Sequence, residues 1–247
     1  MQVVCICNSP PVALSAATSS RSETSHSRSS RAFLDPHRQV FRRIRESGCD
    51  LALWERPLPQ PVARFCEKLV ADRAFADLDV TAESGPALLA ALAKLAPFSR
   101  AEHEPTAHWL LEDIGVLAAE FADASDCGRV RVRFSKVADH GCAVFHIDNL
   151  PARLLCTYAG RGMQWADEPH VRRDELGLRG RSTEEANAAI VPEATNIQTM
   201  PPGAVAIFKG RLWPEGEGRG LVHRSYPVCC SDHARLRLVI DPAGHTY

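Results

Sequence analysis

The pattern of apolar and polar positions differs between the two halves of the chain. Between residues 105 and 124, apolar residues recur at steps of three and four, and the acidic residues lie off that face. This period predicts an amphipathic helix that packs on a sheet and ends at Cys127-Gly128. The predicted apolar face consists of Ala107, Leu110, Leu111, Ile114, Leu117, Ala118 and Phe121.

The rest of the amino-terminal half is predicted to be mostly helical. Shorter helices are expected at about 35–46, 62–73 and 86–95, where prolines open the segments. Alternation over residues 49–54 predicts a short strand, which the prolines that follow it close. We therefore expect residues 33–127 to form a helical region with one strand.

From Gly128 onward the pattern changes to short segments of period two. Residues 129–134 alternate arginine with valine and phenylalanine, which is typical of a half-buried strand. Several short strands after a helical layer predict an α+β protein, in which an antiparallel barrel or sandwich carries helices on its outside. The further strands are expected at 141–146, 153–158, 204–208 and 235–240.

A polar insertion separates two of these strands, at about residues 166–196. Within it, Ser182 and Glu185 have the spacing of a capping box, which predicts a short helix that ends near Ile190. Loops at the mouth of a barrel often carry selectivity, so we expect this insertion to border the substrate site.

Composition narrows the class of protein. A chain of 247 residues is long enough for one large domain, and a net charge of -1 gives no field for holding a phosphate backbone. Nine scattered cysteines without a Cys-x-x-Cys pair argue against a zinc ribbon and favour reduced thiols. No apolar run reaches membrane length. We expect a soluble, cytoplasmic protein with neither nucleic acid nor a membrane as a partner.

The first 32 residues have a different composition. Residues 16–31 are rich in serine and arginine, and the preceding apolar stretch lacks the pattern of a secretory signal. Residues 1–32 are therefore predicted to be a disordered leader, which a misplaced start codon would also explain.

The sequence that carries the most chemical information is His146-Ile147-Asp148. On an extended segment, residues two apart point to the same side, so the imidazole and the carboxylate can converge on one metal ion. The alternative is a surface hydrogen bond at a strand end, because one His-x-Asp pair is common by chance. His223, after the apolar strand at 204–208, can supply the third ligand. Two histidines and one carboxylate leave one face of the metal open, as in non-haem iron sites.

Arg235 and Arg237 share one face of the last predicted strand. A guanidinium that points into a barrel is costly unless it meets an anion, and its planar fork suits a carboxylate. The strand therefore indicates an anion site beside the predicted metal site.

The order His-x-Asp, a strand led by proline and glycine, His-Arg-x-x-Pro and a later arginine resembles that of the iron(II)- and 2-oxoglutarate-dependent dioxygenases, over about residues 128–241. The segment 153–160, followed by Gly162 and Trp165, resembles an uncharacterised bacterial family with a domain of unknown function. The dioxygenase resemblance implies a double-stranded β-helix (jelly-roll) core at 128–247, on which the amino-terminal helical layer packs.

The same resemblance implies roles for individual residues. His146, Asp148 and His223 would bind iron(II), and Arg235 would pair with the distal carboxylate of 2-oxoglutarate. Tyr158 would donate a hydrogen bond to that carboxylate. The family's arginine often follows the distal histidine by about ten residues and precedes x-Ser or x-Thr; here the gap is twelve and Arg237 takes the later position. The choice between Arg235 and Arg237 therefore stays open.

Three functions are compatible with the sequence. The first is an iron(II)- and 2-oxoglutarate-dependent oxygenase that hydroxylates a small molecule or a peptide. The second is a cupin-like metal-binding protein, either an isomerase or a sensor of a metal or small ligand, which uses no 2-oxoglutarate. The third is a non-catalytic interaction module in which the histidines are structural. The sequence specifies neither the substrate nor the oligomeric state.

Overall fold

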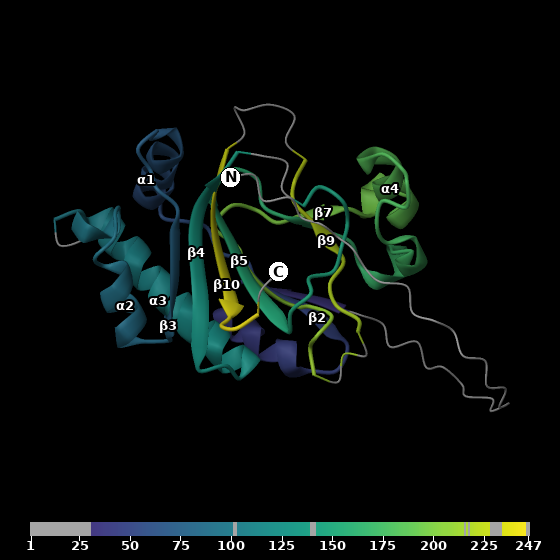
Figure 1. Ribbon diagram of the computed structural model, residues 1–247, viewed down its shortest axis with the longest axis horizontal. Coiled ribbons are helices and arrows are strands. Elements are labelled where there is room, and N and C mark those ends of the chain that lie inside the picture. The colour runs from purple at the N-terminus through teal and green to yellow at the C-terminus, as the bar shows by residue number, and fades with distance from the viewer. Residues whose placement is uncertain are drawn as a thin grey trace, which may run out of the picture.

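The computed structural model describes residues 31–100, 103–138, 142–214, 216, 218–227 and 234–245. Two β-sheets dominate it, and helices α1, α2 and α3 lie on one side of the larger sheet, while β7, β9 and α4 lie on the other side (Figure 1). The larger sheet has the strand order β1-β2-β8-β5-β10-β4-β3, and the smaller has the order β7-β6-β9. Within the described ranges, no helix is long and apolar enough to cross a membrane.

The elements have the following bounds. The strands are β1 Arg31–Asp35, β2 Cys49–Trp54, β3 Leu78–Glu83, β4 Arg129–Val137, β5 Ala152–Ala159, β6 Gln164–Trp165, β7 Gln198–Thr199, β8 Val205–Lys209, β9 His223–Arg224 and β10 Arg235–Pro242. The α-helices are α1 Gln60–Ala71, α2 Pro86–Leu92, α3 Pro105–Ser125 and α4 Thr183–Ile190. The 3-10 helices are η1 Arg38–Arg45, η2 Phe98–Arg100, η3 Glu168–His170, η4 Arg173–Glu175 and η5 Ala194–Asn196.

The amino-terminal region contributes more strand than its sequence indicated. The prediction of one strand in residues 33–127 was wrong, because β1, β2 and β3 all join the larger sheet. β1 is five residues long and β3 buries only its first residue, so both are edge strands without a strong apolar signal. β1 also begins at Arg31 and so overlaps the predicted leader, of which residues 1–30 lie outside the described part of the chain.

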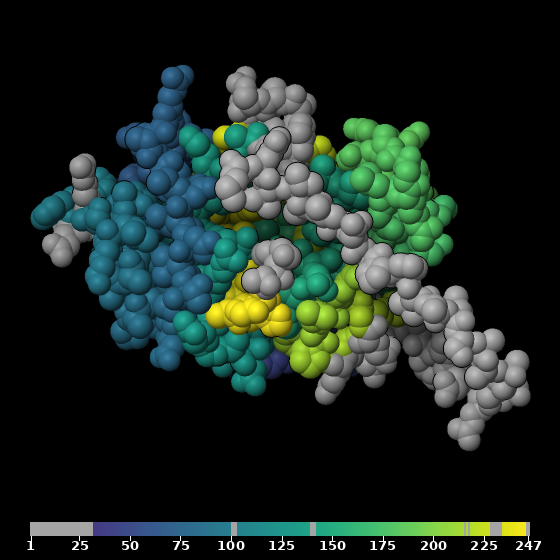
Figure 2. All heavy atoms as spheres, in the orientation of Figure 1, coloured from purple at the N-terminus to yellow at the C-terminus, as the bar shows by residue number. Residues whose placement is uncertain are grey.

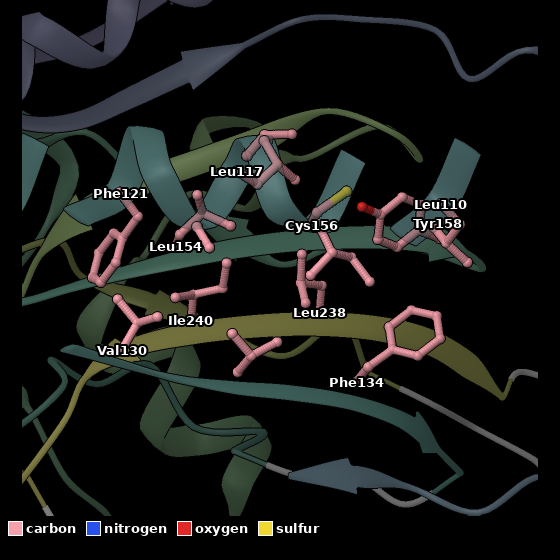
Figure 3. Close-up of a cluster of buried hydrophobic side chains, with 14 of the residues drawn as sticks. Leu110, Leu117, Phe121, Val130, Phe134, Leu154, Cys156, Tyr158, Leu238 and Ile240 are labelled. Carbon is pink, nitrogen blue, oxygen red and sulfur yellow. The ribbon is translucent and has the colours of Figure 1, made fainter. Parts of the chain in front are cut away.

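Helix α3 forms the centre of the core, as its apolar period predicts. Figure 3 shows Leu110, Leu117 and Phe121 of this helix packed against side chains of the larger sheet. The sheet contributes alternate residues of three adjacent strands, namely Val130 and Phe134 of β4, Leu154, Cys156 and Tyr158 of β5, and Leu238 and Ile240 of β10. Burying each large side chain contributes about 1.5–3 kcal/mol, so this contact fixes which face of the sheet the helices cover.

The intervening residues of the same strands point to the opposite face, because side chains alternate along a strand. This face, turned away from α3, is called the inner face here. It carries Arg133 on β4, Arg153 on β5, and Arg235, Arg237 and Asp241 on β10. In antiparallel register, Arg237 lies opposite Thr157 and Ser135, which places these charges on neighbouring strands.

The chain alternates between the two sheets from β4 onward. It passes from β4 through an isolated bridge at His146, beside β9, to β5 in the larger sheet. It then forms β6 and β7 in the smaller sheet, β8 in the larger, β9 in the smaller and β10 in the larger. The predicted strand at 141–146 is reduced to that one bridge at His146, so this prediction was wrong for residues 142–145, while residues 139–141 lie outside the described part.

The insertion at 166–196 forms η3, η4, α4 and η5. Its predicted capping box is confirmed: the Ser182 hydroxyl accepts from the Glu185 amide at 3.2 Å, and the Glu185 carboxylate accepts from the Ser182 amide at 2.8 Å. In the space-filling view, α4 (green) and helices α1 and α2 (blue) lie at opposite sides of the molecule (Figure 2).

Candidate metal centre

His146 and His223 are held side by side by their backbones. The amide of each donates to the carbonyl of the other, at 2.9 and 3.0 Å. This isolated antiparallel bridge brings the two imidazole rings to a centroid separation of 4.6 Å. The ring of Phe208 packs on His223 at the same separation, 4.6 Å. The bridge therefore places two histidine rings side by side, although the residues are far apart in the sequence.

Hydrogen bonds to backbone carbonyls determine which nitrogen of each ring is available to a metal ion. Nδ1 of His146 lies 2.8 Å from the carbonyl oxygen of Val144, and Nδ1 of His223 lies 3.1 Å from that of Leu221. A carbonyl oxygen only accepts, so each Nδ1 carries the proton and donates. In a neutral ring Nε2 is then the atom with the free lone pair, the arrangement typical of a metal-binding histidine.

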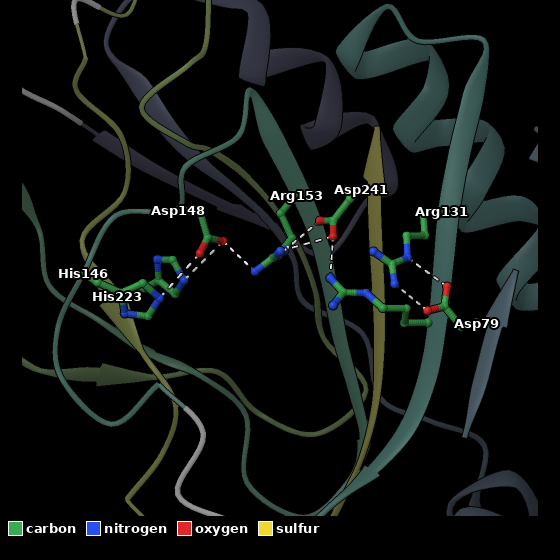
Figure 4. Close-up of polar contacts among 8 residues, drawn as sticks. Asp79, Arg131, His146, Asp148, Arg153, His223 and Asp241 are labelled. Atoms are coloured by element: carbon green, nitrogen blue, oxygen red, sulfur yellow. Dashed lines mark hydrogen bonds and ion pairs between the residues drawn. The ribbon is translucent and has the colours of Figure 1, made fainter. Parts of the chain in front are cut away.

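Both Nε2 atoms face the carboxylate of Asp148 (Figure 4). Nε2 of His146 lies 3.4 Å from Oδ1, and Nε2 of His223 lies 3.6 Å from Oδ2. The ligand atoms of the three residues all lie within 4.8 Å of one another. Lone pairs that converge in this way repel each other unless a cation lies between them, so the donor set fits a divalent metal ion.

Without a metal, the three groups differ in charge, as their pKa values indicate. Burial lowers the pKa of His223 to about 4, so this ring is neutral. Burial opposes a charge on His146, but contacts with Asp148 and Cys142 raise the pKa of His146 to about 10. Burial alone would raise the pKa of Asp148, but Arg153 and the two histidines hold it well below its ordinary value. Without a metal, His146 is thus cationic beside an ionised Asp148 and a neutral His223, and metal binding would release the proton of His146.

The backbone at Asp148 is fixed by a close approach of two segments. The amide of Arg211 donates to the carbonyl of Asp148 at 2.9 Å, and the amide of Gly210 donates to that of Pro151 at 2.8 Å. A Cβ on Gly210 would lie 2.0 Å from the carbonyl oxygen of Leu150, so only glycine fits there. The exposed side of the site is at His146, whose side chain keeps 24% of its accessible surface against 6% for Asp148.

The site continues into a chain of ion pairs that crosses the inner face (Figure 4). Nη1 of Arg153 lies 2.8 Å from Oδ2 of Asp148. The same guanidinium donates from Nε and Nη2 to the two oxygens of Asp241, at 2.7 and 3.1 Å. Nη2 of Arg133 donates to Oδ2 of Asp241 at 2.5 Å. Sequence reasoning missed Arg153 and Asp241, although Arg153 is the one charge in the otherwise mostly apolar strand β5, and that signal could have drawn attention to it.

Arg235 and Arg237 both lie on the inner face, as the shared face in the sequence predicts. Arg235 is buried and Arg237 is partly buried. Burial, together with the nearby guanidinium groups of Arg235, Arg153 and Arg133, lowers the pKa of Arg237 to about 10. These arginines are thus close enough to form one cationic region.

Tyr158 does not belong to this region, so the prediction that it donates to a bound carboxylate was wrong. On β5 it has the same parity as Leu154 and Cys156, which places it on the helix-facing side of the sheet. Its hydroxyl donates to Oδ2 of Asp113 on α3 at 2.5 Å.

The fold and the site together define an α+β protein with a candidate metal centre at the smaller sheet, where His146 pairs with His223 of β9 and Asp148 lies beside them. The chain belongs to the DUF1826 family, described as "Protein of unknown function", whose model matches residues 35–241. This membership agrees with the resemblance of residues 153–165 to an uncharacterised family. Among curated protein sequences, nothing matches the chain significantly.

Solved structures with a similar arrangement include several oxygenases, all at low identity. Dioxygenase for auxin oxidation 1 from Arabidopsis thaliana, in a binary complex with 2-oxoglutarate, is 11% identical and has a TM-score of 0.47, covering 84% of this chain and 88% of that one. A putative oxygenase from Shewanella oneidensis is 12% identical with a TM-score of 0.40, covering 84% and 86%. A prolyl-4-hydroxylase from Pseudomonas putida is 12% identical with a TM-score of 0.39, covering 82% and 96%.

Proposed function

We propose that this protein is an iron(II)- and 2-oxoglutarate-dependent oxygenase that hydroxylates a small molecule or a peptide. The observation that carries the proposal is the convergence of two imidazole Nε2 atoms and one carboxylate within 4.8 Å of one another. Two histidines and one carboxylate occupy one face of an octahedral metal and leave the other face for a cosubstrate and oxygen.

The path of the chain supports a double-stranded β-helix core. In the larger sheet, β8, β5, β10 and β4 are neighbours, and in the smaller sheet β7, β6 and β9 are continued by the bridge at His146. Alternation of successive strands between two facing sheets is what a jelly roll requires. His223 lies on the smaller sheet, His146 pairs with it, and Asp148 follows on the segment that leads to β5, while the arginines lie on the face of the larger sheet that is turned away from α3.

Each part of the chain has a role in this proposal. His146 and His223 direct Nε2 at the metal position because their Nδ1 protons are held by carbonyl oxygens, and a metal ion would replace the second proton of His146. Asp148 supplies a charged oxygen because Arg153 keeps its carboxyl group ionised. Iron(II) with 2-oxoglutarate, when bound, supplies oxidative decarboxylation of the cosubstrate coupled to hydroxylation of the substrate.

Arg237 is the better of the two candidates for the distal carboxylate of 2-oxoglutarate. Its Nε atom is buried and has no hydrogen-bond partner among the described residues. A buried guanidinium beside three other guanidinium groups is strongly stabilised by a bound carboxylate, which supplies both hydrogen bonds and the opposite charge. The spacing of the dioxygenase motif still favours Arg235.

Anaerobic titration with iron(II), with and without 2-oxoglutarate, tests the proposal. We expect a visible charge-transfer absorption only when both are present, and slow formation of succinate after oxygen is admitted. A His146→Ala variant should show neither signal. If the wild-type chain gives no absorption and no succinate, the oxygenase proposal is wrong.

A second candidate function is a cupin-like metal-binding protein, acting as an isomerase or as a sensor of a metal or small ligand. The observation that favours it is the position of Tyr158, which removes one of the groups expected to bind 2-oxoglutarate. Metal analysis of the purified protein separates the two functions. Tightly held zinc or nickel, with no effect of 2-oxoglutarate, supports the second.

A further inference from the structure

The two oxygens of the Asp148 carboxylate have different surroundings. Oδ1 lies 3.4 Å from Nε2 of His146. Oδ2 lies 3.6 Å from Nε2 of His223 but only 2.8 Å from Nη1 of Arg153. Each oxygen thus faces an imidazole that is itself a candidate ligand. Oδ2 also forms an ion pair with Arg153, although it accepts no hydrogen bond from the described residues.

Asp148 also differs from the two histidines in how it is held. Each histidine is fixed by its Nδ1 hydrogen bond and by the reciprocal backbone bridge. Asp148 lies outside the regular strands, on the segment between the bridge and β5. Among the described residues, the closest charged group to its carboxylate is the guanidinium of Arg153. The orientation of this ligand therefore depends on a side chain of the larger sheet.

Arg153 is in turn held rigidly. Its Nε and Nη2 atoms form a two-pronged contact with Asp241, at 2.7 and 3.1 Å, which leaves Nη1 directed at Asp148. Asp241 also accepts from Arg133 on β4 at 2.5 Å. Three adjacent strands thus fix one guanidinium, and a planar guanidinium in a bidentate contact has little freedom to rotate.

We propose that Arg153 is a positioning residue of the metal centre, which holds the Asp148 carboxylate in place beside the two histidines through its ion pair with Oδ2. Asp241 and Arg133 serve to hold Arg153 in place. The inference rests on the metal centre of the proposed function and extends it to residues that make no metal contact.

Loss of a group that orients a metal ligand commonly reduces metal affinity by about ten- to a hundredfold. An Arg153→Met variant removes the cation and both contacts while filling a similar space. It should bind metal at least about tenfold more weakly, because the Asp148 carboxylate loses the group that holds it in place. Arg153→Lys keeps the charge but not the two-pronged contact, so its affinity should lie between the two.

Arg131, on β4 of the same sheet, offers a matched control. It forms a two-pronged contact with Asp79, at 2.8 and 2.6 Å, but none with Asp148 (Figure 4). An Arg131→Met variant removes the same kind of ion pair from the sheet that carries Arg153. It should leave metal binding unchanged.

The test is a titration of the full-length chain with cobalt(II), followed through the visible d–d absorption, which reports both affinity and coordination geometry. Circular dichroism without metal confirms that each variant is folded. Arg153→Met is expected to weaken binding and change the spectrum, while Arg131→Met matches wild type. A folded Arg153→Met variant with the affinity and spectrum of wild type would overturn the inference. No cobalt binding by the wild-type chain would contradict the metal centre itself.

Asp241→Asn tests whether the effect passes through Arg153. This variant should weaken cobalt binding in the same direction as Arg153→Met. In the double variant the two losses should not add, because both act through the position of Asp148. Independent, additive losses would contradict the role of Asp241.

Discussion

Both faces of the larger sheet carry buried ion pairs, but the two clusters differ in the groups with which their charges are partnered. On the helix-facing side, Arg56 and Asp113 form a two-pronged contact at 2.5 and 2.7 Å, and the Tyr158 hydroxyl donates to the same carboxylate. On the inner face, the ion pairs through Arg153 lead to three potential metal ligands whose ligand atoms lie within 4.8 Å of one another. A cluster whose charges pair among themselves indicates a structural role, whereas one that ends in two imidazoles and a carboxylate indicates a place for a metal ion.

The first prediction removes the cation site. A His223→Ala variant loses one of three ligand atoms, so metal affinity should fall by more than about a hundredfold, beyond the loss typical of groups around the ligands. Equilibrium dialysis against iron(II) or zinc(II) measures this. A His170→Ala variant is the control, because His170 is exposed on η3 and lies outside the triad. Equal metal content in both variants would contradict the assignment.

The second prediction breaks the helix-facing cluster. An Asp113→Ala variant leaves Arg56 buried without its carboxylate, which should lower the free energy of unfolding by about 3–5 kcal/mol. Metal affinity should not change, since the cluster lies on the other side of the sheet. Urea denaturation of the metal-free chain measures the loss. As a control, Asp79→Ala breaks a more exposed pair with Arg131 and should cost about 0–1 kcal/mol.

The third prediction distinguishes the two arginines of β10. An Arg237→Gln variant should weaken 2-oxoglutarate binding to the metal-loaded chain by about ten- to a hundredfold, because it removes charge-assisted hydrogen bonds. Arg235→Gln should have the smaller effect. Titrations of the charge-transfer absorption with 2-oxoglutarate give both affinities. The reverse order would assign the distal carboxylate to Arg235, as the motif spacing favours.

The fourth and smallest prediction concerns Tyr158. A Tyr158→Phe variant loses one buried hydrogen bond to Asp113 and should be destabilised by about 0.5–1.5 kcal/mol. Its affinity for 2-oxoglutarate should equal that of wild type. A selective loss of 2-oxoglutarate binding would show that the inner face and the helix-facing side are less separate than the structure indicates.

The sequence predicted the elements with strong periodicity and missed those without it. Helix α3 and strands β4, β5 and β10 follow from long apolar patterns. β1 and β3 are edge strands whose pairing comes from partners distant in the chain, and no local pattern reports that pairing. The segment before His146 was taken for a strand because it is apolar, but only one bridge pairs it.

The sequence likewise predicted part of the site and missed the rest. Two residues of the triad share a local spacing, and His223 could be added because it follows an apolar strand. The contact of Arg153 with Asp241 depends on the register of β5 against β10, which no local pattern contains. Tyr158 was misplaced for a different reason: its parity with Leu154 would have put it on the helix-facing side, had that face been identified from the sequence.

The most direct test of the metal centre is anomalous diffraction at the iron absorption edge, from crystals of the full-length protein grown anaerobically with iron(II). We predict one peak, about 2 Å from Nε2 of His146, Nε2 of His223 and one oxygen of Asp148. Well-ordered iron bound at another position, with the three side chains in contact only with one another, would contradict the account.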